Sequence, residues 1–178
     1  MIVEAVALAR PPVKVDTVRA GDLPLAAPTA WQGLFGHGAL QAGQRVLIPA
    51  GAGGVRHFAL QFAKAKGADV FATASGDGVE FVRSLGADLV IDYHARWFDD
   101  ASPLMDLVFE LVGGDTHERS LAAVAAGGAL ISTFTEPSQS EAARRGARGA
   151  RYRVQPDGTQ LFEIAALIDA GRGWRGCR

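Results

Sequence analysis

The chain has 178 residues, 48% of them hydrophobic, which is enough for one domain with a sizeable core. Its 18 Lys and Arg residues balance 19 Asp and Glu residues, so no overall charge favours nucleic acid or an anionic membrane surface. The single cysteine, Cys177, excludes an intramolecular disulfide and a cysteine-rich zinc site. No apolar run approaches the roughly 20 residues that span a bilayer. The stretch MIVEAVALARPP has no secretion-signal pattern, so we expect a cytoplasmic protein without membrane or nucleic-acid partners.

The first predicted element is a helix with Thr29 as its N-cap and with Trp31, Leu34 and Phe35 facing inward. From Arg45 onward, short apolar runs alternate with helix-like segments. The runs are rich in apolar and β-branched residues, as strands covered on both faces are, and comprise 45–49, 69–74, 88–92, 105–110 and 129–133. The helix candidates between them are 54–66, 79–85 and 116–125. This alternation requires right-handed crossovers and predicts an α/β fold with a doubly wound parallel Rossmann sheet.

The C-terminal part is less regular. Residues 136–150 are polar, basic and interrupted by glycine, which predicts a loop or a mobile segment. Residues 151–155 then offer a sixth strand, and 158–171 an amphipathic helix. The last eight residues, GRGWRGCR, show neither helical nor strand periodicity.

A glycine loop joins the first strand to the first crossover helix. Gly51 and Gly53 are the first two glycines of a G-x-G-x-x-G pattern. In such a loop the first glycine permits a tight turn, the second lets the backbone approach a pyrophosphate, and free N–H groups at the helix start meet the phosphate charge. A tight strand-to-helix turn also needs glycine without any ligand, but the strand–loop–helix–strand context favours a dinucleotide site.

The end of the second strand favours NADP over NAD. A cofactor without a 2′-phosphate usually meets Asp or Glu there, whereas this chain has Ala74, Ser75 and Gly76. A hydroxyl and a bare backbone accept a phosphate that a carboxylate would repel. Asp77 lies close by and no Lys or Arg occurs in residues 71–81, so a simple polar turn stays the alternative.

Several segments together resemble the central part of a medium-chain dehydrogenase/reductase, on the zinc-independent NADPH:quinone oxidoreductase branch. These segments keep the family's order from about Leu23 to Thr133 and read LPLAAPTAWQGLF, AGQRVLIPAGAGGVRHFALQFAKAKGADVFATAS, FVRSLGADLVIDY, DLVFELVGGDTHERSL and GGALIST. The resemblance implies a two-domain parent in which NADPH lies between a nucleotide domain and a GroES-like catalytic domain. It also implies hydride transfer from NADPH to a quinone or a related electrophilic carbonyl compound, without zinc.

The same resemblance assigns cofactor-binding residues but no catalytic residue. Those expected over the pyrophosphate are Gly51, Ala52, Gly53, Gly54 and Val55. Ser75 and Tyr93 are expected near the adenosine ribose and its 2′-phosphate. The residues expected near the nicotinamide half, or at the end of the strand beyond it, are Thr29, Leu111, Val112, Gly113, Ser132 and Thr133.

The chain departs from the family pattern in two respects. Arg56 replaces a family glycine, so it either impairs cofactor binding by overpacking or assists by placing its charge beside the phosphates. The GroES-like domain is largely missing, which gives the expected division 1–28 (remnant of the inter-domain strand and linker), 29–170 (Rossmann dinucleotide-binding domain) and 171–178 (irregular tail). The alternative to an enzyme is therefore a truncated, non-catalytic module or relic. Apolar surface left uncovered near Thr29 and Trp31 predicts self-association, so a homo-oligomer is possible.

The remaining polar residues do not point to another chemistry. The four histidines lack metal-ligand spacing, so no metal site is expected: His37, His57, His94 and His117. The run ARRGARGARYR carries five arginines, which we interpret as a solvated basic loop rather than a nucleic-acid site.

Overall fold

Six parallel strands form one sheet in the described residues, 4–171 of this computed structural model, in the order β3-β2-β1-β4-β5-β6. The strands are β1 (Arg45–Ile48), β2 (Asp69–Ala74), β3 (Leu89–Asp92), β4 (Met105–Glu110), β5 (Val124–Ser132) and β6 (Arg148–Arg151). The chain winds outward from β1 to β3 and then returns to β4 on the other side of β1. The prediction of a doubly wound parallel sheet is confirmed, and its switch point lies between β1 and β4.

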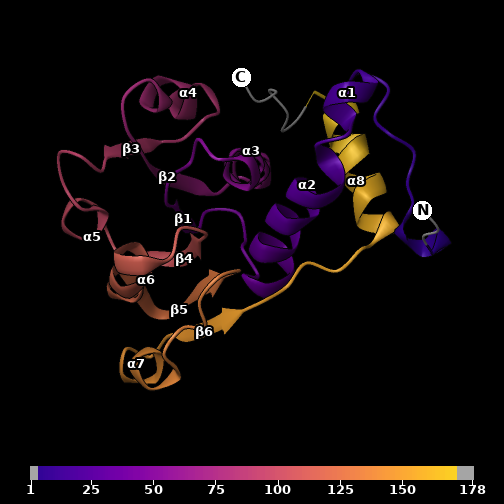
Figure 1. Cartoon of the computed structure of the whole chain (residues 1–178). Coiled ribbons are helices and arrows are strands. Elements are labelled where there is room, and N and C mark those ends of the chain that lie inside the picture. The colour runs from indigo at the N-terminus through magenta and orange to yellow at the C-terminus, as the bar shows by residue number, and fades with distance from the viewer. Residues whose placement is uncertain (1–3, 172–178) are drawn as a thin grey trace.

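Helices cover both faces of the sheet (Figure 1). They are α1 (Thr17–Ala20), α2 (Leu23–Trp31), α3 (Gly54–Lys66), α4 (Gly78–Ser84), α5 (Phe98–Ala101), α6 (Gly114–Ser120), α7 (Gln139–Arg144) and α8 (Gly158–Asp169). Shorter turns are the 3₁₀ segments Ala5–Ala7 and Leu121–Ala123 and the π-helical segment Gln32–His37, which continues α2. Helix α2 packs against both α3 and α8, and it lies between them in Figure 1. None of the described helices is both long and apolar enough to cross a membrane.

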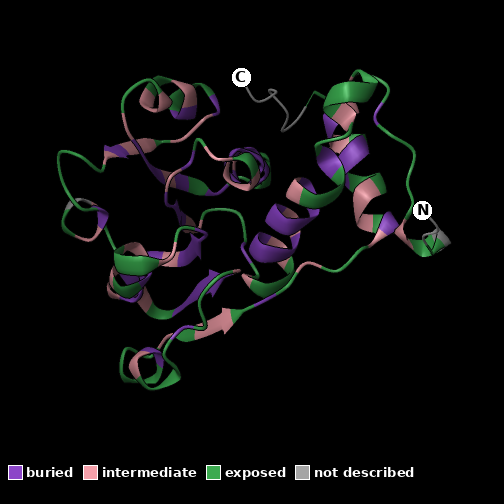
Figure 2. Cartoon of the chain, viewed as in Figure 1, coloured by how far each residue is buried: buried purple, intermediate pink, exposed green. Residues whose placement is uncertain are grey.

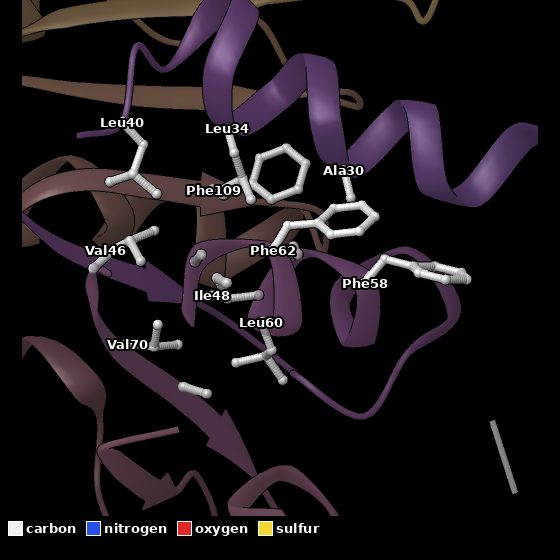
Figure 3. Close-up of a cluster of buried hydrophobic side chains, with 14 of the residues drawn as sticks. Ala30, Leu34, Leu40, Val46, Ile48, Phe58, Leu60, Phe62, Val70 and Phe109 are labelled. Carbon is white, nitrogen blue, oxygen red and sulfur yellow. The ribbon is translucent and has the colours of Figure 1, made fainter. Parts of the chain in front are cut away.

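The alternation of side chains along each strand produces one apolar cluster on each face of the sheet. Val46 and Ile48 of β1 point toward α2 and α3, while Leu47 between them belongs to the cluster on the opposite face. On the first face, Phe58 and Phe62 of α3 belong to the same cluster as Val46 and Ile48, and Figure 3 shows Phe62 on the side of α3 that faces Ala30 of α2. Figure 2 shows the buried residues gathered in the strands and along α2, so the connections at the strand ends are the exposed parts.

The central elements lie where the sequence predicts them. Helix α3 covers the predicted residues 54–66, and β2 and β4 cover 69–74 and 105–110. The amphipathic helix α8 is also confirmed. Glycine in the left-handed conformation ends α3, at Gly67 with φ +86°.

The prediction of Thr29 as an N-cap is wrong. Helix α2 begins at Leu23, six residues earlier, and crosses the boundary expected at residue 28. The Thr29 hydroxyl donates to the carbonyl of Leu25, 2.6 Å away, within the same helix. Leu23, Ala27 and Ala30 are buried against the core, so tertiary packing carries the helix through Pro28.

The prediction for 116–125 runs too far, because α6 ends at Ser120 and β5 begins at Val124. The prediction for 136–150 as a loop or mobile segment is wrong, since this stretch contains α7 and most of β6. The Ser138 hydroxyl caps α7 by accepting from the Glu141 amide, and the Glu141 carboxylate pairs with Arg145 at 2.8 Å. The sixth strand consequently lies three residues before the predicted 151–155. The predicted irregular tail lies outside the described residues beyond Gly171.

Candidate functional site

The glycine loop lies at the carboxyl end of β1 and is fixed to the neighbouring strand β2. The Ala50 amide donates to the Thr73 hydroxyl at 2.9 Å, and the Gly51 amide to the Thr73 carbonyl at 2.8 Å. A Cβ atom at Gly51 would lie 3.0 Å from Leu60 Cδ1 and 3.3 Å from Ala72 Cβ. Glycine at this position is therefore required by packing as well as by any ligand.

The next glycines open the start of α3. Gly53 caps the helix in an extended conformation, and no atom lies within 4 Å of an added Cβ at Gly54. The first N–H groups of an α-helix have no partner within the helix, and its dipole makes this end attractive to anions. The backbone around Gly54 is thus accessible to a phosphate group, as the motif predicts.

Arg56 lies in the first turn of this helix and turns inward rather than toward bulk solvent. Its Nη2 donates to the Leu111 carbonyl at 2.6 Å, and its Nη1 lies 3.4 Å from the Ala50 carbonyl oxygen. Burial lowers the pKa of the Arg56 guanidinium, and the negative charge of Glu110 partly offsets this effect. The side chain therefore crosses the switch point between β1 and β4.

Ser75 and Tyr93 come together at the other side of the loop. The Ser75 hydroxyl donates to the Tyr93 hydroxyl at 2.6 Å, although 18 residues separate them in the chain. Tyr93 is 47% exposed, so its hydroxyl is available to a ligand. The two residues expected near a 2′-phosphate thus form one polar pair beyond the ends of β2 and β3.

Glu110, at the end of β4, is a site residue that the sequence reasoning missed. Its side chain is fully buried and accepts hydrogen bonds from the amides of Val112 and Gly113. His117 Nδ1 and Ser132 Oγ donate to its second carboxylate oxygen at 2.9 and 3.1 Å. The signal in the sequence was a carboxylate at the carboxyl end of an otherwise apolar strand. This carboxylate holds the β4 and β5 loops together.

The other predicted residues of the nicotinamide half differ in accessibility. The Leu111 side chain and the Ser132 hydroxyl are buried. Ser132 Oγ also accepts from the amides of Phe134 and Thr135, so it is used inside the protein. Any ligand contact of Leu111 or Ser132 would come from the backbone.

Two clefts flank the glycine loop. One of about 320 Å³ is lined by Leu25, Thr29, Val55, Thr133, Arg151, Tyr152, Arg153 and Val154. The other, of about 310 Å³, is lined by Pro49, Ala50, Thr73, Tyr93, Trp97, Phe98, Val112 and Thr116. The first brings together Thr29, Val55 and Thr133 of the predicted site, and the second Tyr93 and Val112.

Tyr152 forms part of the wall of the first cleft. Its hydroxyl donates to the Thr29 carbonyl, and burial raises the pKa of the phenol well above its usual value. A Cβ atom at Gly33 would lie 2.6 Å from this hydroxyl, so glycine is needed for the close approach of the π-helical segment Gln32–His37 to Tyr152.

Arginines of the basic segment make contacts within the protein. Arg148 donates to the carbonyls of His37 and Gly38, and Arg151 pairs with Glu136 at 3.8 Å. Within residues 4–171, no group of three or more His, Cys, Asp or Glu side chains is arranged to hold a metal ion.

Comparison with known proteins identifies relatives over nearly the whole chain. A family model described as zinc-binding dehydrogenase matches residues 54–143. An NADPH-dependent alkenal/one oxidoreductase of Arabidopsis thaliana chloroplasts is 36% identical over 96% of this chain and 42% of its own length. A probable zinc-binding oxidoreductase of Arthroderma benhamiae mitochondria is 32% identical over 93% of this chain and 55% of its own length.

A solved structure has the same architecture. The quinone oxidoreductase from Coxiella burnetii superposes with a TM-score of 0.82 and 34% identity, covering 89% of this chain and 51% of that protein. The chain therefore spans about half the length of these relatives.

Proposed function

Because the chain belongs to the medium-chain dehydrogenase/reductase superfamily, we propose that residues 23–170, which include the whole of α2, are the NADP(H)-binding domain of an oxidoreductase. The reaction would transfer hydride from NADPH to a quinone or a related electrophilic carbonyl compound. The observation that carries the cofactor choice is the pair of hydroxyls of Ser75 and Tyr93, 2.6 Å apart, with no carboxylate at the end of β2. Names of the relatives, which include an NADPH-dependent alkenal/one oxidoreductase and a quinone oxidoreductase, support the reaction class.

The geometry of the domain fits most of the cofactor. The open backbone at Gly54 would hold the pyrophosphate, and Ser75 and Tyr93 the 2′-phosphate. When bound, the reduced nicotinamide supplies the hydride. Thr29 and Thr133, which line one cleft, would orient that half of the cofactor. Glu110 would keep the Val112–Gly113 backbone in place.

Zinc has no role in this proposal. The described residues offer no set of three or more metal-binding side chains, although the matching family model carries the description zinc-binding dehydrogenase. The resemblance to the zinc-independent branch supports a reaction without zinc that depends on positioning of the two reactants. The cytoplasmic location expected from the sequence stays a prediction, since relatives include chloroplast and mitochondrial proteins. The expected homo-oligomer also stays a prediction.

The second candidate is a module that binds the cofactor without turnover. It is favoured by Arg56, whose guanidinium reaches the Leu111 carbonyl at 2.6 Å across the switch point between β1 and β4. Two measurements on the same protein separate the candidates: titration with NADPH and NADH, and NADPH oxidation with benzoquinone or an alkenal as acceptor. Turnover of NADPH supports the enzyme, whereas binding of NADPH without turnover supports the module. If neither NADPH nor NADH binds, both candidate functions are refuted.

A further inference from the structure

Arg56 connects the two sides of the crevice at the point where the winding of the sheet reverses. Strands β1 and β4 are neighbours there, with Val46 opposite Leu107 and Leu47 opposite Val108. The Arg56 guanidinium contacts the backbone just beyond both strands, at the carbonyls of Ala50 and Leu111. Ligands of doubly wound sheets bind in this crevice. The arginine therefore lies in the position through which a dinucleotide would pass.

The guanidinium also fills space that the glycine loop leaves open. A Cβ atom at Gly53 would lie only 2.4 Å from Arg56 Nη1 and 3.1 Å from Cζ. The second glycine of the motif normally gives the pyrophosphate close access to the backbone. At Gly53 this space is used by a side chain of the same protein.

The bonds that hold Arg56 inward are few. Its Nε is buried without a hydrogen-bond partner among the described residues, and no ion pair of Arg56 occurs among them. Two backbone carbonyls therefore carry the contact, at 2.6 and 3.4 Å. A ligand that needs this space must break the short hydrogen bond from Arg56 to the Leu111 carbonyl. Breaking this bond weakens binding of that ligand by about 10- to 100-fold.

The two halves of the site are affected differently. Ser75 follows β2 and Tyr93 follows β3, both on the side of β1 away from β4. Leu111, the main partner of Arg56, follows β4 on the opposite side. Contacts to the adenosine end thus lie apart from the arginine, whereas the nicotinamide end requires the region that it occupies.

We propose that Arg56 closes the pyrophosphate and nicotinamide part of the crevice and leaves the adenosine end open. The chain then binds an adenosine 2′-phosphate that lacks the pyrophosphate independently of Arg56, but binds intact NADPH only after the side chain leaves Leu111. This inference rests on the proposed function of the same site, and it makes Arg56 a determinant of which ligand the site accepts.

The test compares two ligands by calorimetric titration: NADPH, and adenosine 2′-monophosphate, which lacks both the pyrophosphate and the nicotinamide half. The proteins are the wild type, Arg56→Gly and Arg56→Ala, where alanine supports the helix should the glycine variant fold poorly. Arg144→Ala is the matched control, because Arg144 is a 74% exposed arginine of α7. We expect NADPH to bind about 10- to 100-fold more tightly to both Arg56 variants. Adenosine 2′-monophosphate should bind equally to all four proteins.

Other outcomes overturn the inference in distinguishable ways. Weaker NADPH binding by the Arg56 variants would identify the arginine as a phosphate ligand, and unchanged NADPH binding would show that it obstructs nothing. In both cases the proposed function survives. Equal improvement for both ligands would refute the division into halves. Failure of every protein to bind adenosine 2′-monophosphate would refute the proposed function together with the inference.

Discussion

Replacing Glu110 by Gln tests whether a buried carboxylate holds the loops of the site. The carboxylate accepts from Val112 and Gly113 at one oxygen and from His117 and Ser132 at the other. In Glu110→Gln one oxygen becomes an NH₂ group, which is a donor facing the Ser132 hydroxyl, and that hydroxyl already accepts from two amides. His117 can adapt by taking the tautomer in which Nδ1 accepts. Because the side chain is fully buried, water cannot replace the lost acceptor.

The expected loss of stability follows from this count of contacts. The hydrogen bond from Ser132 to the charged group disappears in either tautomer of His117, and such a bond contributes roughly 1.5–3 kcal/mol. We therefore expect the free energy of unfolding to fall by about 1.5–3 kcal/mol, a sizeable part of the 5–15 kcal/mol typical of a domain.

Urea unfolding followed by tryptophan fluorescence measures this change through the shift of the transition midpoint. Glu163→Gln is the matched control, because Glu163 is an exposed glutamate of α8 and its substitution should be neutral. A loss below about 1 kcal/mol in Glu110→Gln, comparable with surface substitutions, would refute the assignment of Glu110 as the structural centre of these loops.

Three further predictions concern the walls of the site. Gly33→Ala should lower the free energy of unfolding by about 1–3 kcal/mol, because the added Cβ would lie 2.6 Å from the Tyr152 hydroxyl. The control is Gly36→Ala, whose added Cβ has no atom within 4 Å and which should be near neutral in the same urea assay. Since burial raises the pKa of Tyr152, its stabilising contribution is complete below the unfolded pKa of about 10 and is lost as the pH rises above it. Stability measured across this range should fall more steeply in the wild type than in Tyr152→Phe, by up to about 1.4 kcal/mol per pH unit, and parallel curves would contradict the role of burial. Ser75→Asp should weaken NADPH binding by about tenfold or more, because its carboxylate would repel the 2′-phosphate, and it should leave NADH binding intact. The control is Ser140→Asp, at an exposed serine. Equal losses of affinity for both coenzymes would exclude a 2′-phosphate contact at residue 75.

The secondary structure was predictable where burial leaves a local pattern. The run Val46–Ile48 is apolar on both faces of its strand, and the stripe that includes Phe58 and Phe62 has the period of a helix. The segment 136–150 was mispredicted because its stabilising contacts are polar. The pairs of Glu141 and the edge pairing of β6 with β5 leave no apolar periodicity to detect.

The same distinction applies to the site. The glycine loop was predictable, because a strand, a tight turn and a helix follow one another in the chain and each has its own local signature. Family resemblance placed Ser75 and Tyr93 in one region without predicting their contact, and the cluster around Glu110 was not foreseen. Their partners lie 18 and up to 22 residues away.

By itself, the sequence determined the alternation of strands and helices, hence the parallel sheet and the edge at which its loops gather. The direction of the Arg56 side chain was decided only by the tertiary structure. From the sequence, an inward or an outward arginine was equally compatible with a helix start. The strand order places the carbonyl of Leu111 within 2.6 Å of the guanidinium, although 55 residues separate the two in the chain. Hydrogen bonds form between neighbours in space, and these neighbours are brought together only when the sheet is assembled.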